Sequence, residues 1–148
     1  MTSLLFKKCS PAWTDYGLLA LRIAMGAIFI MHGYAKITGF GVAGVSKMLG
    51  GIGFPAPELF AYLLMYGEVA TGIAIILGAL TYWASLFQLV VAIVAGVFVH
   101  FPKGFSVGDG GYEFVMLLGA AAFLLLTSGP GKYSVDAKMQ ATDTGGAM

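Results

Sequence analysis

Four apolar stretches, at residues 16–37, 57–79, 82–99 and 112–127, occupy most of this 148-residue chain. An apolar run of about 20 residues, rising about 1.5 Å per residue as a helix, matches a hydrocarbon layer about 30 Å thick. Each stretch is apolar on all sides apart from a few ionisable residues, which is typical of helices in lipid rather than of strands. The sequence therefore predicts an all-α, integral membrane four-helix bundle.

The composition of the chain agrees with a membrane protein and excludes several other classes. Charged residues make up 10% and hydrophobic residues 59%, and the mean hydropathy is +0.89, whereas soluble domains contain about 25% charged residues. A net charge of +1 gives no basis for nucleic-acid binding. Cys9 is the only cysteine, so this chain alone can form no disulfide, dithiol pair or thiolate metal cage.

The segments outside the four spans predict how the chain is arranged in the membrane. Residues 38–56 are rich in glycine and carry apolar residues at helical spacing opposite Ser46 and Lys47, which predicts a short interfacial helix. Four spans place both termini, residues 1–15 and 128–148, on one side, and we expect the tail from Lys132 to Met148 to be disordered. Loop lysines number four on the terminal side against three on the other, which favours cytoplasmic termini.

Six ionisable side chains interrupt the apolar spans or lie at their ends: Arg22, His32, Lys36, Glu68, His100 and Glu113. A charged side chain at the centre of a bilayer costs about 2.5–3.5 kcal/mol on insertion scales, so such groups are expected to meet partners inside the bundle. With neutral histidines the four remaining formal charges, two positive and two negative, sum to zero, as pairing in a low dielectric requires. We predict that Glu68 bonds to Arg22 or to the His32/Lys36 face, and that Glu113 bonds to His100 or Lys36.

Four glycines mark the expected contacts between helices. Gly26 and Gly33 lie on the polar stripe of the first span, and Gly72 shares a helical face with Glu68. Gly96, four residues after an alanine in the third span, completes a small-xxx-small pair. Helices in lipid pack closely through such small residues, so we predict these four as helix-packing positions.

The ionisable residues leave two interpretations open. They are either polar glue that fixes helix register, or the lining of a polar pocket that opens to the outer leaflet and holds a quinone head group or a small anion. His32 and His100 lie on different helices at similar depth, which is compatible with bis-imidazole ligation of a haem. Two histidines without a spacing signature are poor evidence for haem, however, and no metal site is predicted.

Short motifs follow one another along most of the chain, from Leu18 to Asp136. Their ordered set resembles the DoxX family of small bacterial membrane proteins, and the motifs that carry the resemblance are Arg22-Ile-Ala-Met-Gly26, Phe29-Ile-Met-His32-Gly33-Tyr-Ala-Lys36, Gly53-Phe-Pro55-Ala-Pro57, Gly110-Gly111-Tyr112-Glu113 and Gly129-Pro130-Gly131-Lys132-Tyr133-Ser134-Val135-Asp136. The resemblance implies a multi-pass bundle in the bacterial inner membrane, associated with respiratory or redox-defence systems. It also implies a role for the same six ionisable residues, without a catalytic assignment for any of them.

The leading hypothesis is a small accessory subunit beside a larger membrane oxidoreductase, which helps to bind quinone or to route electrons or protons. A self-sufficient quinone reductase is disfavoured because no flavin, nicotinamide or thiol motif is visible. The alternatives are a carrier or permeability protein for a small anion or metabolite, and a purely structural membrane subunit. Glycine-rich helix faces make a homo-oligomer a further expectation.

Overall fold

The computed structural model describes residues 10–145, so Lys7, Lys8 and Cys9 lie outside the described residues. Within that range every regular element is helical. Six α-helices form, joined in part by π-helical and 3₁₀ segments, and their bounds are α1 Pro11–Ala35, α2 Gly41–Gly51, α3 Pro57–Leu77, α4 Thr81–Val94, α5 Glu113–Ser128 and α6 Val135–Gly145. The π-helical segments are Lys36–Phe40 and Ala95–His100, and the 3₁₀ segments are Phe101–Lys103 and Val107–Asp109.

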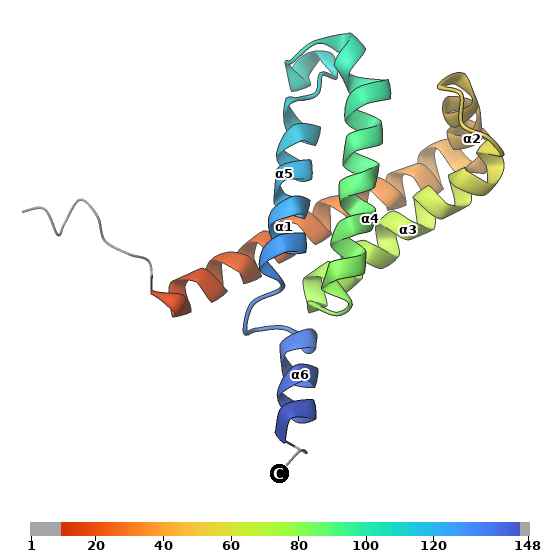
Figure 1. Cartoon of the computed structure of the whole chain (residues 1–148). Helices are drawn as coiled ribbons and strands as arrows, with labels where there is room; N and C mark the ends of the chain where they lie inside the picture. The colour runs from red at the N-terminus through yellow and green to blue at the C-terminus, as the bar shows by residue number, and fades with distance from the viewer. Residues whose placement is uncertain (1–9, 146–148) are drawn as a thin grey trace, which may run out of the picture.

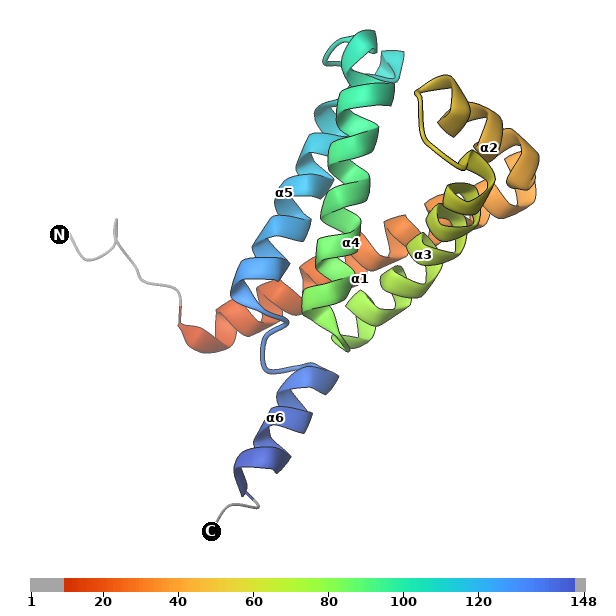
Figure 2. The same cartoon turned by 45° about the vertical axis from the view of Figure 1, so that its right-hand side comes forward.

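The bundle consists of two helix pairs (Figures 1 and 2). Helices α1 and α3 lie side by side, and α4 and α5 form the second pair, inclined to the first. The pairs converge near the turn between α3 and α4 and diverge toward α2. We call the end that carries α6 the terminal end and the end that carries α2 the opposite end.

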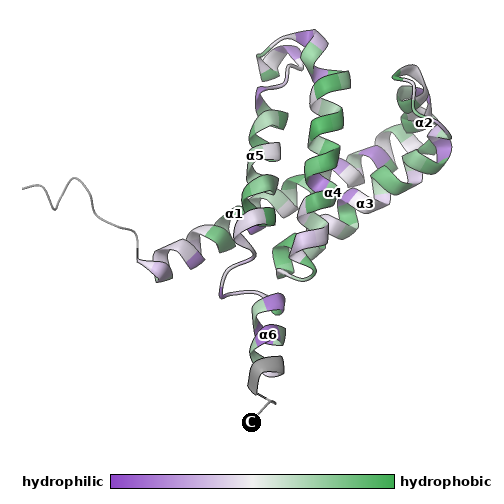
Figure 3. Ribbon diagram, viewed as in Figure 1, coloured by the Kyte–Doolittle hydropathy of each residue, from purple (hydrophilic) through white to green (hydrophobic). Residues whose placement is uncertain are grey.

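Three helical segments are long and apolar enough to cross a membrane: Pro11–Gly51, Pro57–Leu77 and Thr81–Lys103. The fourth apolar helix, α5, has 16 residues and a length of about 24 Å, somewhat less than the hydrocarbon thickness. Large apolar side chains such as Leu63, Ile73 and Leu117 are exposed on the outside of the bundle, and the ribbons of α4 and α5 are largely hydrophobic in Figure 3. These faces fit a lipid environment, and the prediction of an all-α membrane bundle is confirmed.

Close backbone contact joins α1 to α3. A Cβ atom on Gly26 would lie 2.5 Å from the Gly72 carbonyl oxygen, and one on Gly72 would lie 2.8 Å from the Gly26 carbonyl oxygen. A Cβ on Gly33 would meet the Met65 carbonyl oxygen at 2.8 Å. These three glycines therefore let the two backbones touch, which is how helices associate in lipid. A Cβ on Gly96 would make only an ordinary contact, 3.8 Å from Val115 Cγ1.

Within residues 38–56, the segment Gly41–Gly51 forms a helix, α2, that packs on the bundle. It buries Val45 and Leu49 against Ala61 and Met65 of α3, while Lys47 stays exposed. Helix α1 runs into α2 through the π-helical segment Lys36–Phe40. The apolar side of α2 therefore covers the beginning of α3 at the opposite end.

The expectation that the chain is disordered from Lys132 onward is wrong for most of the tail. Residues Val135–Gly145 form α6, and residues 146–148 lie outside the described range. Asp136 holds this segment to the turn between α3 and α4: its carboxylate oxygens accept from the Leu80 and Thr81 amides at 2.9 Å each, and its own amide donates to the Gly78 carbonyl at 2.9 Å. Leu80 adopts a left-handed conformation, with φ of 49°, so these bonds stabilise a turn that an L-residue otherwise disfavours.

Candidate polar cavity between the helix pairs

A cavity of about 300 Å³ lies between the α1–α3 pair and the α4–α5 pair, on the side covered by α2. Its walls are mostly apolar and include Phe29, Leu64, Phe87, Val91 and Leu118. Its ionisable lining comes from four of the predicted residues, which are His32, Lys36, Glu68 and His100. The cavity therefore combines a largely hydrophobic interior with a few convergent polar groups, the usual character of a small-molecule site.

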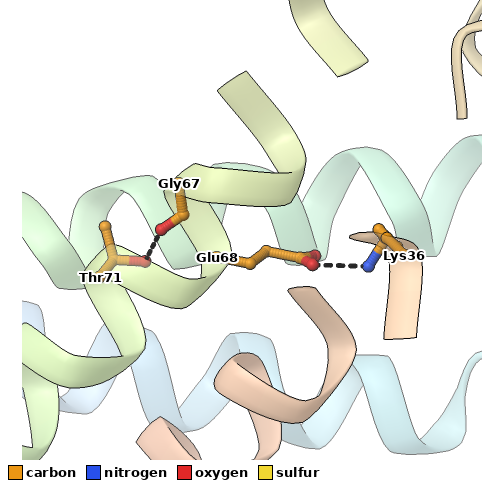
Figure 4. A network of polar contacts seen from close by, with 4 residues as sticks. All are labelled: Lys36, Gly67, Glu68 and Thr71. Carbon is orange, nitrogen blue, oxygen red and sulfur yellow. Dashed lines mark hydrogen bonds and ion pairs between the residues drawn. The ribbon is translucent and has the colours of Figure 1, made fainter. Parts of the chain in front are cut away.

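Lys36 and Glu68 form an ion pair in this cavity. Lys36 Nζ donates to Glu68 Oε2 at 2.6 Å, and the side chains are 21% and 4% exposed, respectively. In Figure 4 the Glu68 side chain extends from α3 toward Lys36, away from Thr71 on the same helix. The structure thus pairs Glu68 with the His32/Lys36 face, one of the two alternatives expected from the sequence.

The two histidines lie beside this ion pair. His32 is within electrostatic range of both Lys36 and His100, and its ring lies 6.3 Å from that of Phe114. His100 Nδ1 lies 2.7 Å from the Gly110 carbonyl oxygen. Because a carbonyl oxygen can only accept, Nδ1 carries the proton, and Nε2 of the neutral ring is then an acceptor.

Both π-helical segments carry an ionisable side chain of the cavity. Lys36 begins the segment Lys36–Phe40, and His100 ends the segment Ala95–His100. Short π-helical turns within α-helices are rare and occur frequently at functional sites, because the wider turn changes the direction of a side chain. Their presence on both sides of one cavity marks it as the candidate site.

Arg22 lies elsewhere, at the terminal end, so the expected alternative of a bond to Glu68 is wrong. Its guanidinium donates to the carbonyl oxygens of Ile75 at 3.0 Å, Ile76 at 2.9 Å and Pro130 at 2.7 Å. Arg22 is only 1% exposed. A cation at the carboxyl end of a helix also interacts favourably with the helix dipole, here that of α3. Arg22 therefore joins α1 to the end of α3 and to the loop before α6.

The negative charge of Asp136 acts on Arg22 without a direct ion pair between them among the described residues. Partial burial favours the neutral acid, but hydrogen bonds from Thr81 and Leu80, together with the Arg22 charge, hold the pKa of Asp136 below its ordinary value. The terminal end thus contains its own charge-balanced group, separate from the cavity.

Glu113 is also outside the cavity, and the prediction that it bonds to His100 or Lys36 is wrong. Glu113 is the first residue of α5, and its carboxylate accepts from the Val107 amide at 2.5 Å. The loop before α5 places this amide next to Glu113, and a carboxylate in the first turn of a helix is favourable. Glu113 therefore closes the loop between α4 and α5.

Comparison with known proteins decides the family. The DoxX family profile matches residues 17–101, which is more than half of the chain. The chain belongs to the DoxX family. The matched segment includes Arg22 and all four ionisable residues of the cavity, whereas Glu113 lies beyond it.

Relatives of this DoxX chain agree with a location in the inner membrane. It is 32% identical to "Inner membrane protein YqjF" of Escherichia coli over 82% of the chain and 91% of the relative. It is 34% identical to "Inner membrane protein YphA" of the same organism over 80% and 87%. A Bacillus subtilis protein named "Putative oxidoreductase CatD" is 28% identical over 70% and 74%. No solved structure gives a significant match.

Sequence reasoning missed a second buried polar group in the DoxX chain. Gln88 Nε2 donates to Thr71 Oγ1 at 3.3 Å, and Thr71 donates to the Gly67 carbonyl at 2.6 Å. Gln88 and Ser85 are both fully buried, at 0% exposure. The sequence feature that could have revealed this group is the glutamine in the middle of an apolar span, because a polar side chain there is expected to face the interior of the bundle.

Proposed function

We propose that this chain is a small accessory subunit of a respiratory or redox-stress oxidoreductase in the bacterial inner membrane, and that its cavity binds a quinone head group. The observation that carries the proposal is the placement of Lys36, Glu68 and two imidazoles inside one mostly apolar cavity. The word oxidoreductase in the name of the Bacillus subtilis relative supports an association with redox enzymes. As the lysine distribution predicts, the termini would then be cytoplasmic.

The chemistry of the cavity suits a quinone. The Lys36 ammonium can donate to a quinone carbonyl oxygen. His100 donates from Nδ1 to the Gly110 carbonyl, which leaves Nε2 as the nitrogen that can accept from the hydroxyl of the reduced form. Phe29 and Phe87 supply aromatic surface for the ring. The lining also includes Met48, Leu63 and Val90, which are exposed on the outside of the bundle. An apolar quinone tail would therefore leave the cavity directly into lipid.

A small anion suits the cavity less well. Glu68 offsets the charge of Lys36 at 2.6 Å, and transfer of an anion into an apolar space is costly when no unpaired cation is present. This argument ranks a carrier or permeability protein below a quinone-binding subunit. A purely structural subunit remains the third alternative, and it predicts no ligand in the cavity.

Equilibrium binding of a short-tailed ubiquinone to the full chain in lipid nanodiscs tests the proposal, with partition into empty nanodiscs subtracted. Saturable binding is expected, and Lys36→Met should weaken it by about tenfold or more, the effect of losing one charge-assisted hydrogen bond. Lys132→Met is the matched control, because it removes a lysine at the terminal end that does not line the cavity. Binding that is unsaturable, or equally strong in both variants, would reject the quinone site.

Purification from native membranes tests the subunit role. A redox enzyme should accompany the wild-type chain through mild detergent and cross-linking. Recovery of this chain alone or as a homo-oligomer in every condition would reject the accessory role, while the binding experiment would still decide whether quinone occupies the cavity.

A further inference from the structure

Helix α4 directs a polar stripe, formed by Thr81, Ser85 and Gln88, into the interior of the bundle. The three residues are at most 1% exposed. In the part of the chain that the structure describes, Ser85 Oγ and Gln88 Oε1 are buried without a hydrogen-bond partner. A buried polar atom without a partner costs about 1–3 kcal/mol, so two of them on one helix face are not explained by packing.

The stripe runs from the terminal end toward the cavity. Thr81 begins α4, and Ser85 and Gln88 follow about 6 Å and about 10.5 Å further along the helix axis. At the level of Gln88 the hydrogen bond to Thr71 crosses to α3. Glu68 lies three residues from Thr71, about 4.5 Å further toward the opposite end. The stripe and the cavity together cover successive parts of the membrane thickness.

One carboxylate bonds at the terminal end of the stripe, and a second, Glu68, lies on α3 one helical turn beyond the inner end. At the terminal end, Asp136 is partly exposed and accepts from the Thr81 amide at 2.9 Å. Beyond the inner end, Glu68 lines the cavity, and so does Phe87, the chain neighbour of Gln88. Polar groups three and four residues apart on one helix face are separated by about 5–6 Å, a gap that one hydrogen-bonded water spans, and buried polar atoms commonly bind such waters.

We propose that Thr81, Ser85, Gln88 and Thr71 form a hydrated path that carries protons between the aqueous phase at the terminal end and Glu68. A proton enters from water near Asp136. It is passed along hydroxyls and bound waters, each oxygen accepting one proton and releasing another, and the Gln88 amide orients water without itself carrying the proton. The path ends when the Glu68 carboxylate becomes a neutral acid, which gives up its ion pair with Lys36 in the cavity that His32 and His100 also line. One proton moves and no electrons are exchanged.

This inference goes beyond the proposed function, because it concerns proton access to Glu68 whatever molecule occupies the cavity. A purely structural role for the stripe makes a different prediction. In that case loss of Ser85 or Gln88 would change stability without changing how fast Glu68 gains a proton.

Rapid-mixing infrared spectroscopy of the full chain in nanodiscs tests the path. After a drop in pH, the carboxylic-acid band that Glu68→Gln abolishes reports protonation of Glu68. In Ser85→Ala and Gln88→Leu this band should appear about tenfold more slowly, as expected for loss of one hydrogen-bonded step. Thr127→Val is the control, since it removes an exposed hydroxyl on α5 that bonds only to its own helix.

The outcomes separate clearly. A wild-type rate in both Ser85→Ala and Gln88→Leu would overturn the path, and so would the lack of any Glu68-dependent band down to the acid limit of folding. Ser85→Ala is a small change, so it keeps the test valid if Gln88→Leu disturbs packing, which far-ultraviolet circular dichroism detects. None of these measurements uses a quinone, so failure of quinone binding leaves this test unaffected.

Discussion

The Lys36–Glu68 ion pair makes an asymmetric prediction about stability. The Glu68 side chain is 4% exposed and the Lys36 side chain 21% exposed. Lys36→Met leaves the deeply buried carboxylate without its partner, and breaking a buried pair in this way costs about 3–5 kcal/mol. Glu68→Gln leaves an ammonium on a flexible stem that can move toward water, so its cost should be smaller, about 1–2 kcal/mol. Lys36→Met should therefore be the more destabilising of the two changes.

A double-mutant cycle measures the interaction itself. The double variant Lys36→Met/Glu68→Gln contains no unpaired charge at this site, so its loss of stability should be less than the sum of the single losses by about 2–3 kcal/mol. Reversible unfolding in mixed detergent and lipid micelles, followed by circular dichroism, gives the free energies of unfolding. Glu68→Gln combined with Lys132→Met is the control and should be additive within about 0.5 kcal/mol. Equal additivity in the Lys36 cycle, or a larger loss from Glu68→Gln than from Lys36→Met, would refute the reasoning.

Three further predictions concern the rest of the bundle, and thermal unfolding in detergent measures all of them. Arg22→Lys should lower stability by about 2–3 kcal/mol, because one ammonium cannot reach the three carbonyl oxygens that the guanidinium bonds; a neutral effect would show that these bonds contribute little. Gly72→Ala should cost about 1–3 kcal/mol through overpacking against the Gly26 carbonyl, whereas Gly96→Ala, with its nearest contact at 3.8 Å, should be close to neutral. Because the pKa of Asp136 is lowered in the folded chain, its contribution to stability is present above the ordinary value of 3.8 and is lost as pH falls through the lower folded value; Asp136→Asn should weaken this loss at acid pH, and an unchanged acid profile would contradict the assignment.

Residue spacing was enough to predict the fold, and it narrowed the partner of Glu68 to two alternatives, Arg22 or the His32/Lys36 face. The second of these is correct, and it was available because a charged residue in an apolar span must find a partner within the bundle. The glycines at 26, 33 and 72 were predictable for a related reason, since close helix contact in lipid requires small residues. In both cases a physical requirement can be recognised from a single residue in the sequence. A charged side chain in an apolar span needs a partner, and close contact between helices needs a small side chain.

Interactions with the backbone were not predictable in the same way. Glu113 bonds to the Val107 amide and Asp136 to the Leu80 and Thr81 amides, and these amides become available only through the conformation of particular turns. Charge counting treats side chains as partners for each other, and it therefore assigned Glu113 to His100 or Lys36. The same omission led to the expectation of a disordered tail, because the bonds that hold α6 involve Asp136 and a turn more than 50 residues earlier.

Arg22 and Lys36 both lie on the first span, but their side chains differ in chemistry. This difference explains why Arg22 joins helices while Lys36 is the candidate for contact with a ligand. The Arg22 guanidinium is satisfied by three carbonyl oxygens in fixed positions, a geometry that its planar, rigid set of donors matches and that leaves little room for change. Lys36 ends in a compact ammonium with three donors, pairs with Glu68 and remains 21% exposed within the cavity lining. A donor of this kind can keep its carboxylate partner and still bond to a ligand oxygen. The same formal charge therefore joins helices at the terminal end, whereas in the cavity it stands at the start of a π-helical turn and supplies the donor that the proposed quinone would use.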